Sequence, residues 1–299
     1  MSEPASDRIT VPALVARKAG RAKIVALTAY DFPTAEILDR MGVDLILVGD
    51  SLGMVVLGYE DTVAVTLDDV LHHTKAVVRA VRRALVVADM PFLSFHVSAE
   101  DALRNAGRML QEGGAHAVKI EGGSPRRLEI VRALVQSEIP VLGHVGLTPQ
   151  SILRLGQFKV QGGDAAEAAR IVGEAEALQD AGVFGIVLEC IPREVAAEIT
   201  RRLAVPTIGI GAGSSCDGQI LVLHDLVGFS HGYNPKFVRR YADIDSVIAG
   251  AVDRYGQDVR AGRFPDDSHS YHLKPGQVRG FLELAKRRAN EPRPKRGRR

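Results

Sequence analysis

The chain has 299 residues, of which 46% are hydrophobic and 25% charged, a composition that excludes disorder of the whole chain. The formal net charge of +2 conceals an asymmetry, because residues 286–299 carry eight Lys or Arg and one Glu. The rest of the chain is therefore mildly acidic, with a net charge of −5, which argues against a nucleic-acid-binding fold.

Short apolar runs alternate with helical patterns along the chain. Residues 10–20 predict a short extra helix that covers the bottom of a barrel. Apolar runs that end in glycine or a turn are typical of buried parallel strands, and they are found at 23–31, 44–50, 84–90, 116–123, 139–146, 184–190 and 205–213. Helices are predicted between them at 33–42, 67–81, from Ser98, from Pro125, near Ala165 and from Pro192.

The last part of the pattern is less regular. Residues 221–229 are expected to hold an eighth strand, and 244–262 a last long helix. Eight strand–helix repeats favour a closed (β/α)₈ TIM barrel over an open sheet, and no GxGxxG follows the first strand. We expect one barrel domain over 1–272 and an extension at 273–299, which is basic and disordered at its end.

Four acidic residues each close one of the predicted strands. They are Asp50, Asp89, Glu121 and Glu189. A carboxylate at the C-terminal end of a barrel strand points into the mouth where active sites of this fold lie. Four carboxylates at one mouth would repel each other unless a cation lies among them.

The first three acids come from neighbouring strands and predict a metal site. Asp50, Asp89 and Glu121 supply oxygen ligands with no Cys or His among them, which favours Mg²⁺ over Zn²⁺. A 2-oxo acid could complete the coordination, so that the metal stabilises an enolate. Glu189 lies across the pocket, where it is well placed to act as a general base.

Two basic side chains share the same mouth. Lys119 precedes Glu121 by two residues, so both point to one face of the strand. We favour charge stabilisation by Lys119 over a Schiff base, with a structural ion pair as the alternative. His144 closes the fifth strand, where it either contacts a ligand or serves as a hydrogen-bonding residue. The glycine-rich segment 208–219 either cradles a phosphate or makes a tight turn.

Six segments of the chain resemble the ketopantoate hydroxymethyltransferase family. They are VGDSLGM (48–54), VADMPF (87–92), VKIEGG (118–123), GHVGLTPQS (143–151), VLECIP (187–192) and IGIGAGSSCDGQILVLHD (208–225). The resemblance runs from about residue 10 to residue 272, with the segments in the family's order and spacing.

This resemblance implies a Mg²⁺-dependent barrel enzyme of pantothenate biosynthesis. Such enzymes transfer a hydroxymethyl group from the co-substrate 5,10-methylenetetrahydrofolate to 3-methyl-2-oxobutanoate, giving 2-dehydropantoate. The family's roles carry over to metal ligands Asp50, Asp89 and Glu121, and to Glu189 as the proton-abstracting acid. Ser51, Lys119 and His144 would contact the substrate, together with Asp50 and Asp89. The resemblance also implies one Mg²⁺ per subunit and a homodecamer.

Two other classes of function remain open at this stage. A C–C lyase or mutase of the pyruvate/phosphoenolpyruvate barrel type would use the same enolate chemistry without folate, but no KKCGH-like segment is present. A non-enzyme could bind nucleic acid or a partner through 286–299, with strong salt dependence, although a solvated appendage is the simpler interpretation.

The location of the protein is predicted from its cysteines and its apolar runs. Cys190 and Cys216 form no disulfide framework and no CxxC pattern, which is typical of the reducing cytoplasm. The first 18 residues do not resemble a secretory signal, and no apolar run reaches membrane-spanning length. We therefore expect neither membrane nor nucleic acid among its partners.

Overall fold

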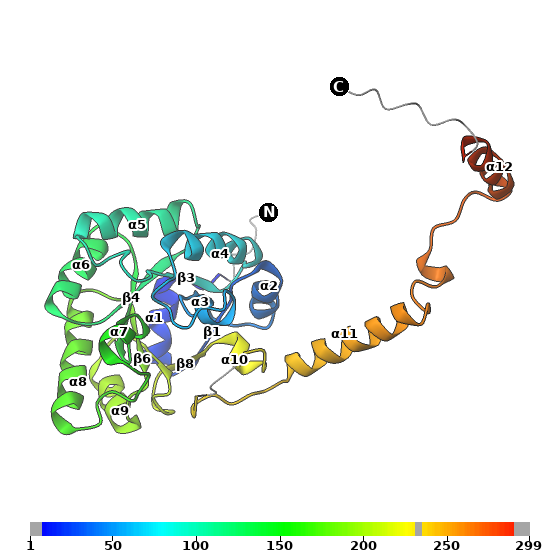
Figure 1. The fold of residues 1–299 in the computed structure, drawn as a ribbon. Coiled ribbons are helices and arrows are strands. Elements are labelled where there is room, and N and C mark those ends of the chain that lie inside the picture. Colours follow the sequence, from blue (N-terminus) through cyan, green and yellow to red (C-terminus); the bar gives the residue numbers. More distant parts are fainter. Residues whose placement is uncertain (1–7, 231–234, 290–299) are drawn as a thin grey trace. The chain divides into compact units, whose positions relative to one another are not determined.

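The computed structural model describes residues 8–230 and 235–289, and its core is a closed barrel of parallel strands (Figure 1). Within these residues eight strands pair in chain order, and β8 closes the ring against β1. The strands are β1 (Ile24–Thr28), β2 (Leu45–Val48), β3 (Leu85–Asp89), β4 (Ala117–Glu121), β5 (Val141–Gly146), β6 (Gly185–Glu189), β7 (Thr207–Ile210) and β8 (Gly218–Leu221). The predicted TIM barrel is confirmed, and the first seven strands lie within their predicted ranges.

Helices surround the barrel in Figure 1. Several begin at a side chain that accepts a hydrogen bond from the backbone of the first turn, as Ser98 does from the N–H of Asp101. The long helices are α2 (Phe32–Arg40), α4 (Leu67–Ala80), α5 (Ala99–Gln111), α6 (Pro125–Gln136), α8 (Ala165–Asp180) and α9 (Arg193–Arg202). Short helical turns are α3 (Leu52–Val55), η1 (Pro149–Ser151), α7 (Ile152–Leu155) and α10 (Leu223–Leu226).

The strands separate two apolar cores because successive side chains point to opposite faces. In β3, Leu85 and Val87 belong to the cluster inside the barrel. Val86 and Ala88 belong to the larger cluster between strands and helices. The same alternation carries Asp89 to the inner face at the end of β3, so the pattern that builds the core also positions the polar mouth.

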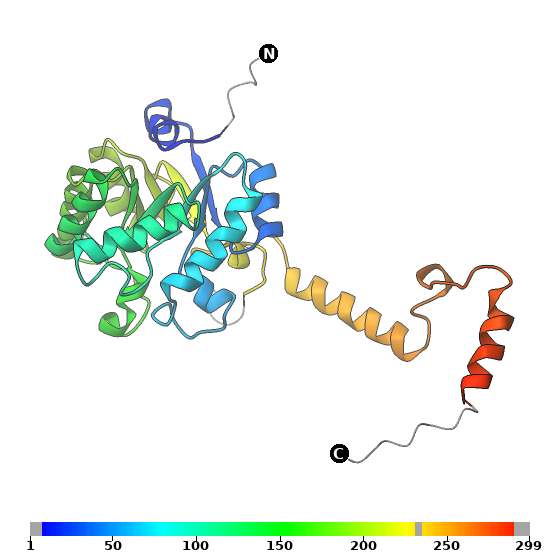
Figure 2. The ribbon, with the colours of Figure 1, turned by 90° about the horizontal axis from the view of Figure 1, so that it is seen from above.

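The helix α1 (Val11–Gly20) covers the opposite end of the barrel, as residues 10–20 predicted (Figure 2). Its Leu14 is fully buried in the inner cluster. Arg17 contacts Asp44 at 2.7 Å and Lys18 contacts Asp217 at 2.8 Å. Since these two acids directly precede β2 and β8, the helix packs against the N-terminal ends of the strands.

The predicted position of the eighth strand is wrong. Residues 223–226 of the expected 221–229 form α10, and the strand lies earlier, at Gly218–Leu221. The position of β8 is decided by its pairing register with β1 and β7, and not by the apolar content of the segment. A Cβ at Gly218 would lie 2.6 Å from the Cβ of Ile24, so the close approach of β8 to β1 depends on glycine.

The chain divides into two compact units, Met1–Asp243 and Ile244–Arg299, so the boundary falls before the predicted one at residue 272. The second unit contains α11 (Ile244–Arg260), η2 (Asp267–His269) and α12 (Gln277–Ala289), and neither long helix buries a residue. The helix α12 includes Lys286–Ala289, because good helix formers fill its last turns. The expected disorder at the end of the extension stays a prediction, since residues 290–299 lie outside the described part. Among the described residues, no helix has both the length and the apolar character needed to cross a membrane.

Candidate active site

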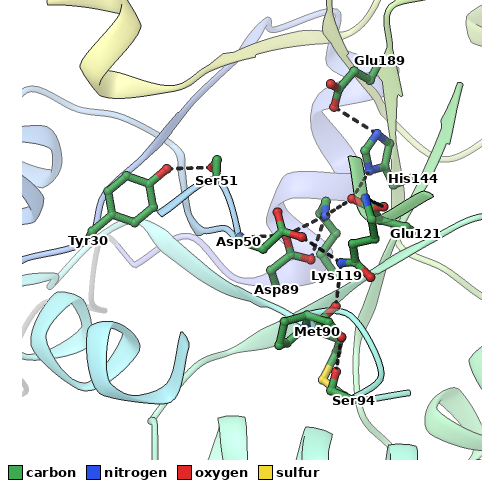
Figure 3. A network of polar contacts seen from close by, with 12 residues as sticks. Tyr30, Asp50, Ser51, Asp89, Met90, Ser94, Lys119, Glu121, His144 and Glu189 are labelled. Carbon is green, nitrogen blue, oxygen red and sulfur yellow. Dashed lines mark hydrogen bonds and ion pairs between the residues drawn. The ribbon is translucent and has the colours of Figure 1, made fainter. Parts of the chain in front are cut away.

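The polar side chains at the ends of β3 to β6 form a row inside the barrel mouth (Figure 3). Asp89 is in register with Lys119, and Glu121 is in register with His144. Glu189 ends β6, which pairs with β5. Residues on one strand two positions apart share a face, so the alternation of each strand aims these side chains at a common space.

Lys119 forms a buried ion pair with the neighbouring strand. Its Nζ lies 2.7 and 2.8 Å from the two carboxylate oxygens of Asp89 and 3.5 Å from Oε1 of Glu121. Burial by itself would lower the pKa of Lys119, but the charges of Asp89, Glu121 and Asp50 together outweigh burial and the pKa is raised. The ammonium is therefore held charged, as an ion pair or a charge-stabilising group requires.

His144 lies between two carboxylates. Its Nδ1 is 3.5 Å from Oε1 of Glu121, and its Nε2 is 3.2 Å from Oε2 of Glu189. Neither contact has hydrogen-bond geometry, so the attraction is ionic. Burial by itself would lower the pKa of His144, but the two carboxylates outweigh burial and raise the pKa to about 9. The imidazolium thus links Glu121 to Glu189.

Gln150, which follows β5, contacts the acidic side chains of the site. The sequence interpretation gave this residue no role. Its side-chain amide donates to Oδ2 of Asp50 and to the carbonyl of Met90, both at 3.0 Å. Its backbone N–H donates to Glu121 at 3.2 Å. The only sequence signal for Gln150 is its position in the segment that follows a strand, two residues after Thr148. This signal is weak, because a glutamine in such a segment is usually exposed to solvent.

Asp50 joins the acidic group, whereas Ser51 faces elsewhere. The backbone N–H of Asp50 donates to Oδ2 of Asp89 at 3.3 Å, and its own carboxylate accepts from Gln150. The hydroxyl of Ser51 instead lies 2.8 Å from the hydroxyl of Tyr30 (Figure 3). The structure therefore brings Asp50 into the row and leaves Ser51 on the Tyr30 side of the mouth.

The charges at the barrel mouth do not balance without a further cation. Four carboxylates stand against two cations, the Lys119 ammonium and the His144 imidazolium. Burial, together with the charges of Asp89 and Glu121, raises the pKa of Asp50 well above its usual range, and burial also raises that of Asp89. A divalent cation would offset this excess, and carboxylate oxygens suit Mg²⁺. Among the described residues no three His, Cys, Asp or Glu side chains already surround an ion position. The fit therefore rests on the charge and chemistry of the donors.

The glycines after β7 are explained by backbone conformation and close packing. Gly211 and Gly213 have φ angles of +64° and +80°. A Cβ at Gly211 would lie 2.8 Å from the Phe237 ring, and one at Gly213 would lie 2.7 Å from Cβ of Arg193. These contacts account for the tight-turn interpretation of 208–219, and the phosphate interpretation stays a prediction.

Solved structures with very different sequences share this barrel. A phosphoenolpyruvate phosphomutase from Streptomyces platensis subsp. rosaceus matches with a TM-score of 0.58 at 13% identity, over 94% of this chain and 98% of that one. A 2,3-dimethylmalate lyase, described as a member of the PEP mutase/isocitrate lyase superfamily, matches with a TM-score of 0.55 at 16% identity, over 95% and 100%. At such identities the likeness shows the fold alone.

Closer relatives carry one name. The 3-methyl-2-oxobutanoate hydroxymethyltransferase of Thermoanaerobacter sp. (strain X514) is 57% identical over 258 residues, covering 86% of this chain and 93% of the relative. That of Moorella thermoacetica (strain ATCC 39073 / JCM 9320) is 55% identical over 89% of this chain and 98% of the relative. The family model described as ketopantoate hydroxymethyltransferase matches residues 8–267. The chain therefore belongs to the ketopantoate hydroxymethyltransferase family, as its six motifs predicted.

Proposed function

We propose that this chain transfers a hydroxymethyl group from 5,10-methylenetetrahydrofolate to 3-methyl-2-oxobutanoate, giving 2-dehydropantoate. The observation that carries the proposal is the row from Asp89 through Lys119, Glu121 and His144 to Glu189, found in a chain whose relatives bear that enzyme name. The cations Lys119 and His144 alternate with the acids of this row, and a partly open carboxylate ends it, an arrangement suited to holding a 2-oxo acid and removing a proton from it.

Glu189 is the group that would take the proton. Its side chain is 17% exposed, whereas those of Asp89 and Glu121 are 1% and 4% exposed and contact Lys119. The C3–H bond of the substrate breaks, its proton passes to the Glu189 carboxylate, and the bonding electrons form the enolate. His144, the proposed substrate contact, would hold the Glu189 carboxylate in place and remain charged.

Asp50, Asp89 and Glu121 would hold Mg²⁺ in this proposal. Bound there, the ion would supply Lewis-acid polarisation of the 2-oxo group, which makes the C3 hydrogen more acidic. Lys119 would neutralise the charge of the substrate carboxylate when its ammonium is only partly engaged by Asp89. Ser51, with Tyr30 behind it, would contact the substrate from the other side.

The carbon–carbon bond then forms between C3 of the enolate and the one-carbon unit of the folate. One water supplies the hydroxyl oxygen and both carbon–nitrogen bonds to the one-carbon unit break. The two nitrogens take one proton from Glu189 and one from the water, and tetrahydrofolate leaves. The proposal extends to one Mg²⁺ per subunit, a homodecamer and a cytoplasmic location. The free thiols of Cys190 and Cys216 agree with a reducing compartment.

Turnover tests the proposal directly. Purified protein is incubated with 3-methyl-2-oxobutanoate and methylenetetrahydrofolate, with Mg²⁺ or with a chelator, and 2-dehydropantoate is measured. We expect product only when both substrates and the divalent ion are present. Cleavage of a 2-oxo acid without folate would instead favour a lyase, and the proposed function would be abandoned.

A further inference from the structure

A cavity of about 690 Å³ opens beside the acidic row and is not used by the chemistry proposed above. Its inner wall includes Glu121 and Gln150, and its outer walls come from the start of α6, the loop around α7, and α8. This volume lies within the usual range for sites that bind small organic molecules. Because the cavity reaches Glu121, a molecule in it would lie next to the enolate.

The inner end offers an unused hydrogen-bond acceptor. Gln150 is 5% exposed, and its side-chain N–H groups are engaged by Asp50 and Met90. Its Oε1 is buried and has no partner among the described residues. A buried acceptor without a partner is costly, so this atom indicates that a donor group of a ligand belongs there.

His96 supplies an aromatic part of the cavity wall and is partly exposed. Its ring lies 4.2 Å from that of Phe95, which is fully buried beneath the guanidinium of Arg127, 4.7 Å from the ring centroid. A partly exposed aromatic side chain suits an aromatic ring of a ligand.

The outer end carries positive charge that the protein does not neutralise. Arg154 and Lys159 line the cavity, and in the described part of the chain neither they nor Arg127 form an ion pair with an acid. The two acids on the outer wall, Glu167 and Glu174, are both engaged by Arg170, at 3.9 and 2.5 Å. The outer end therefore suits a ligand that carries carboxylates.

We propose that this cavity binds the one-carbon donor as an extended molecule, an inference that rests on the proposed function. The acceptor, the aromatic side chain and the cations correspond to the pterin, p-aminobenzoyl ring and glutamate of tetrahydrofolate. A pterin N–H donates to Oε1 of Gln150, the p-aminobenzoyl ring lies along His96, and the glutamate carboxylates contact Arg154 and Lys159. This places the one-carbon unit at the Glu121 end, where the enolate forms.

Binding of two probes tests this placement. Tetrahydrofolate and 6-methyltetrahydropterin, which lacks the aromatic ring and glutamate, are titrated calorimetrically into protein saturated with 3-methyl-2-oxobutanoate. In the double variant Arg154→Gln/Lys159→Gln we expect the Kd of tetrahydrofolate to rise by at least about fivefold, as the loss of charged contacts at an exposed site implies. The Kd of the pterin should stay within about twofold. Arg132→Gln, an exposed site on α6 outside the cavity, is the matched control and should change neither.

Each further outcome decides the question. An unchanged Kd for tetrahydrofolate in the double variant would overturn the placement, while wild-type turnover would leave the proposed function intact. An equal rise in Kd for both probes would also overturn the placement, because Arg154 and Lys159 would then not be contacting the glutamate of tetrahydrofolate. Wild-type protein that neither turns over nor binds tetrahydrofolate would refute the proposed function, and this inference with it.

Discussion

Nε2 of His144 and Oε2 of Glu189 lie 3.2 Å apart across the β5–β6 pair. On its other side the same imidazole contacts Glu121, which Lys119 also approaches. A charged histidine in this position separates two carboxylates with different surroundings. Glu121 lies in the buried ionic group, and Glu189 lies at its open edge, so one acid can bind an ion while the other takes a proton.

Loss of a proposed metal ligand should weaken metal binding. Asp50→Ala and Asp89→Ala each remove an anionic oxygen from a hard cation, so the Mg²⁺ dissociation constant should rise by at least about tenfold. Calorimetric titration measures it, with Asp180→Ala at the exposed end of α8 as the control. If both site variants bind Mg²⁺ as tightly as wild type, the ligand assignment is wrong.

Lys119 should matter for stability without any substrate. Lys119→Met leaves Asp89 and its neighbours buried without their cation, and breaking a buried pair in this way costs about 3–5 kcal/mol of unfolding free energy. Lys75→Met is the matched control, because Lys75 and Glu112 form an exposed pair at 3.7 Å and the expected loss is below about 1 kcal/mol. Urea unfolding without added metal compares them. Equal losses would mean that the Lys119 pair is as weak as a surface contact.

Much of the fold followed from apolar periodicity, but the eighth strand did not. Residues 221–229 are richer in apolar side chains than Gly218–Leu221, and a local pattern favours them. The strand is positioned by pairing with β1 and β7 on both sides, which is a property of the closed barrel. The helix α12 continues through Lys286–Ala289 into the basic segment 286–299, which the charge of that segment alone does not reveal.

The site was predicted more completely than the connections between its parts. Strand-end position and two-residue spacing predicted that Asp50, Asp89, Lys119, Glu121 and His144 lie together, as they do in Figure 3, while their roles stay predictions. Gln150 could not be found in this way, because it reaches Asp50 across 100 positions of sequence from a loop. Contacts of this kind depend on how loops fold over the barrel mouth, and no local pattern encodes them.

The thiol next to the proposed base should react slowly. Burial, followed by the charge of Glu189, raises the pKa of Cys190 to about 12, so the thiolate stays rare until the pH approaches that value. At pH 8, alkylation of Cys190 by iodoacetamide should be more than about a hundredfold slower in the folded protein than in urea. Mass spectrometry of the labelled peptide measures the rate. Similar rates in both states would contradict the raised pKa.

Removal of residues 286–299 should leave turnover nearly unchanged. The described part, Lys286–Ala289, is exposed and buries no apolar surface. We expect kcat within about twofold of the full chain, since segments without buried contacts tolerate truncation. Steady-state assays of the two proteins decide the point. A large loss of kcat would show that the segment acts on a site, including one on a neighbouring subunit.

The most direct measurement of the central claim follows the C3 hydrogen of 3-methyl-2-oxobutanoate in deuterated water by NMR, without folate. Wild-type protein with Mg²⁺ should exchange this hydrogen. Glu189→Gln keeps the side-chain shape but is not a useful base, so exchange should slow by about 10²–10⁴-fold with little change in substrate affinity. Glu129→Gln, at an exposed position on α6, should exchange like wild type. Exchange at the wild-type rate in Glu189→Gln would contradict the account, because another group would then take the proton.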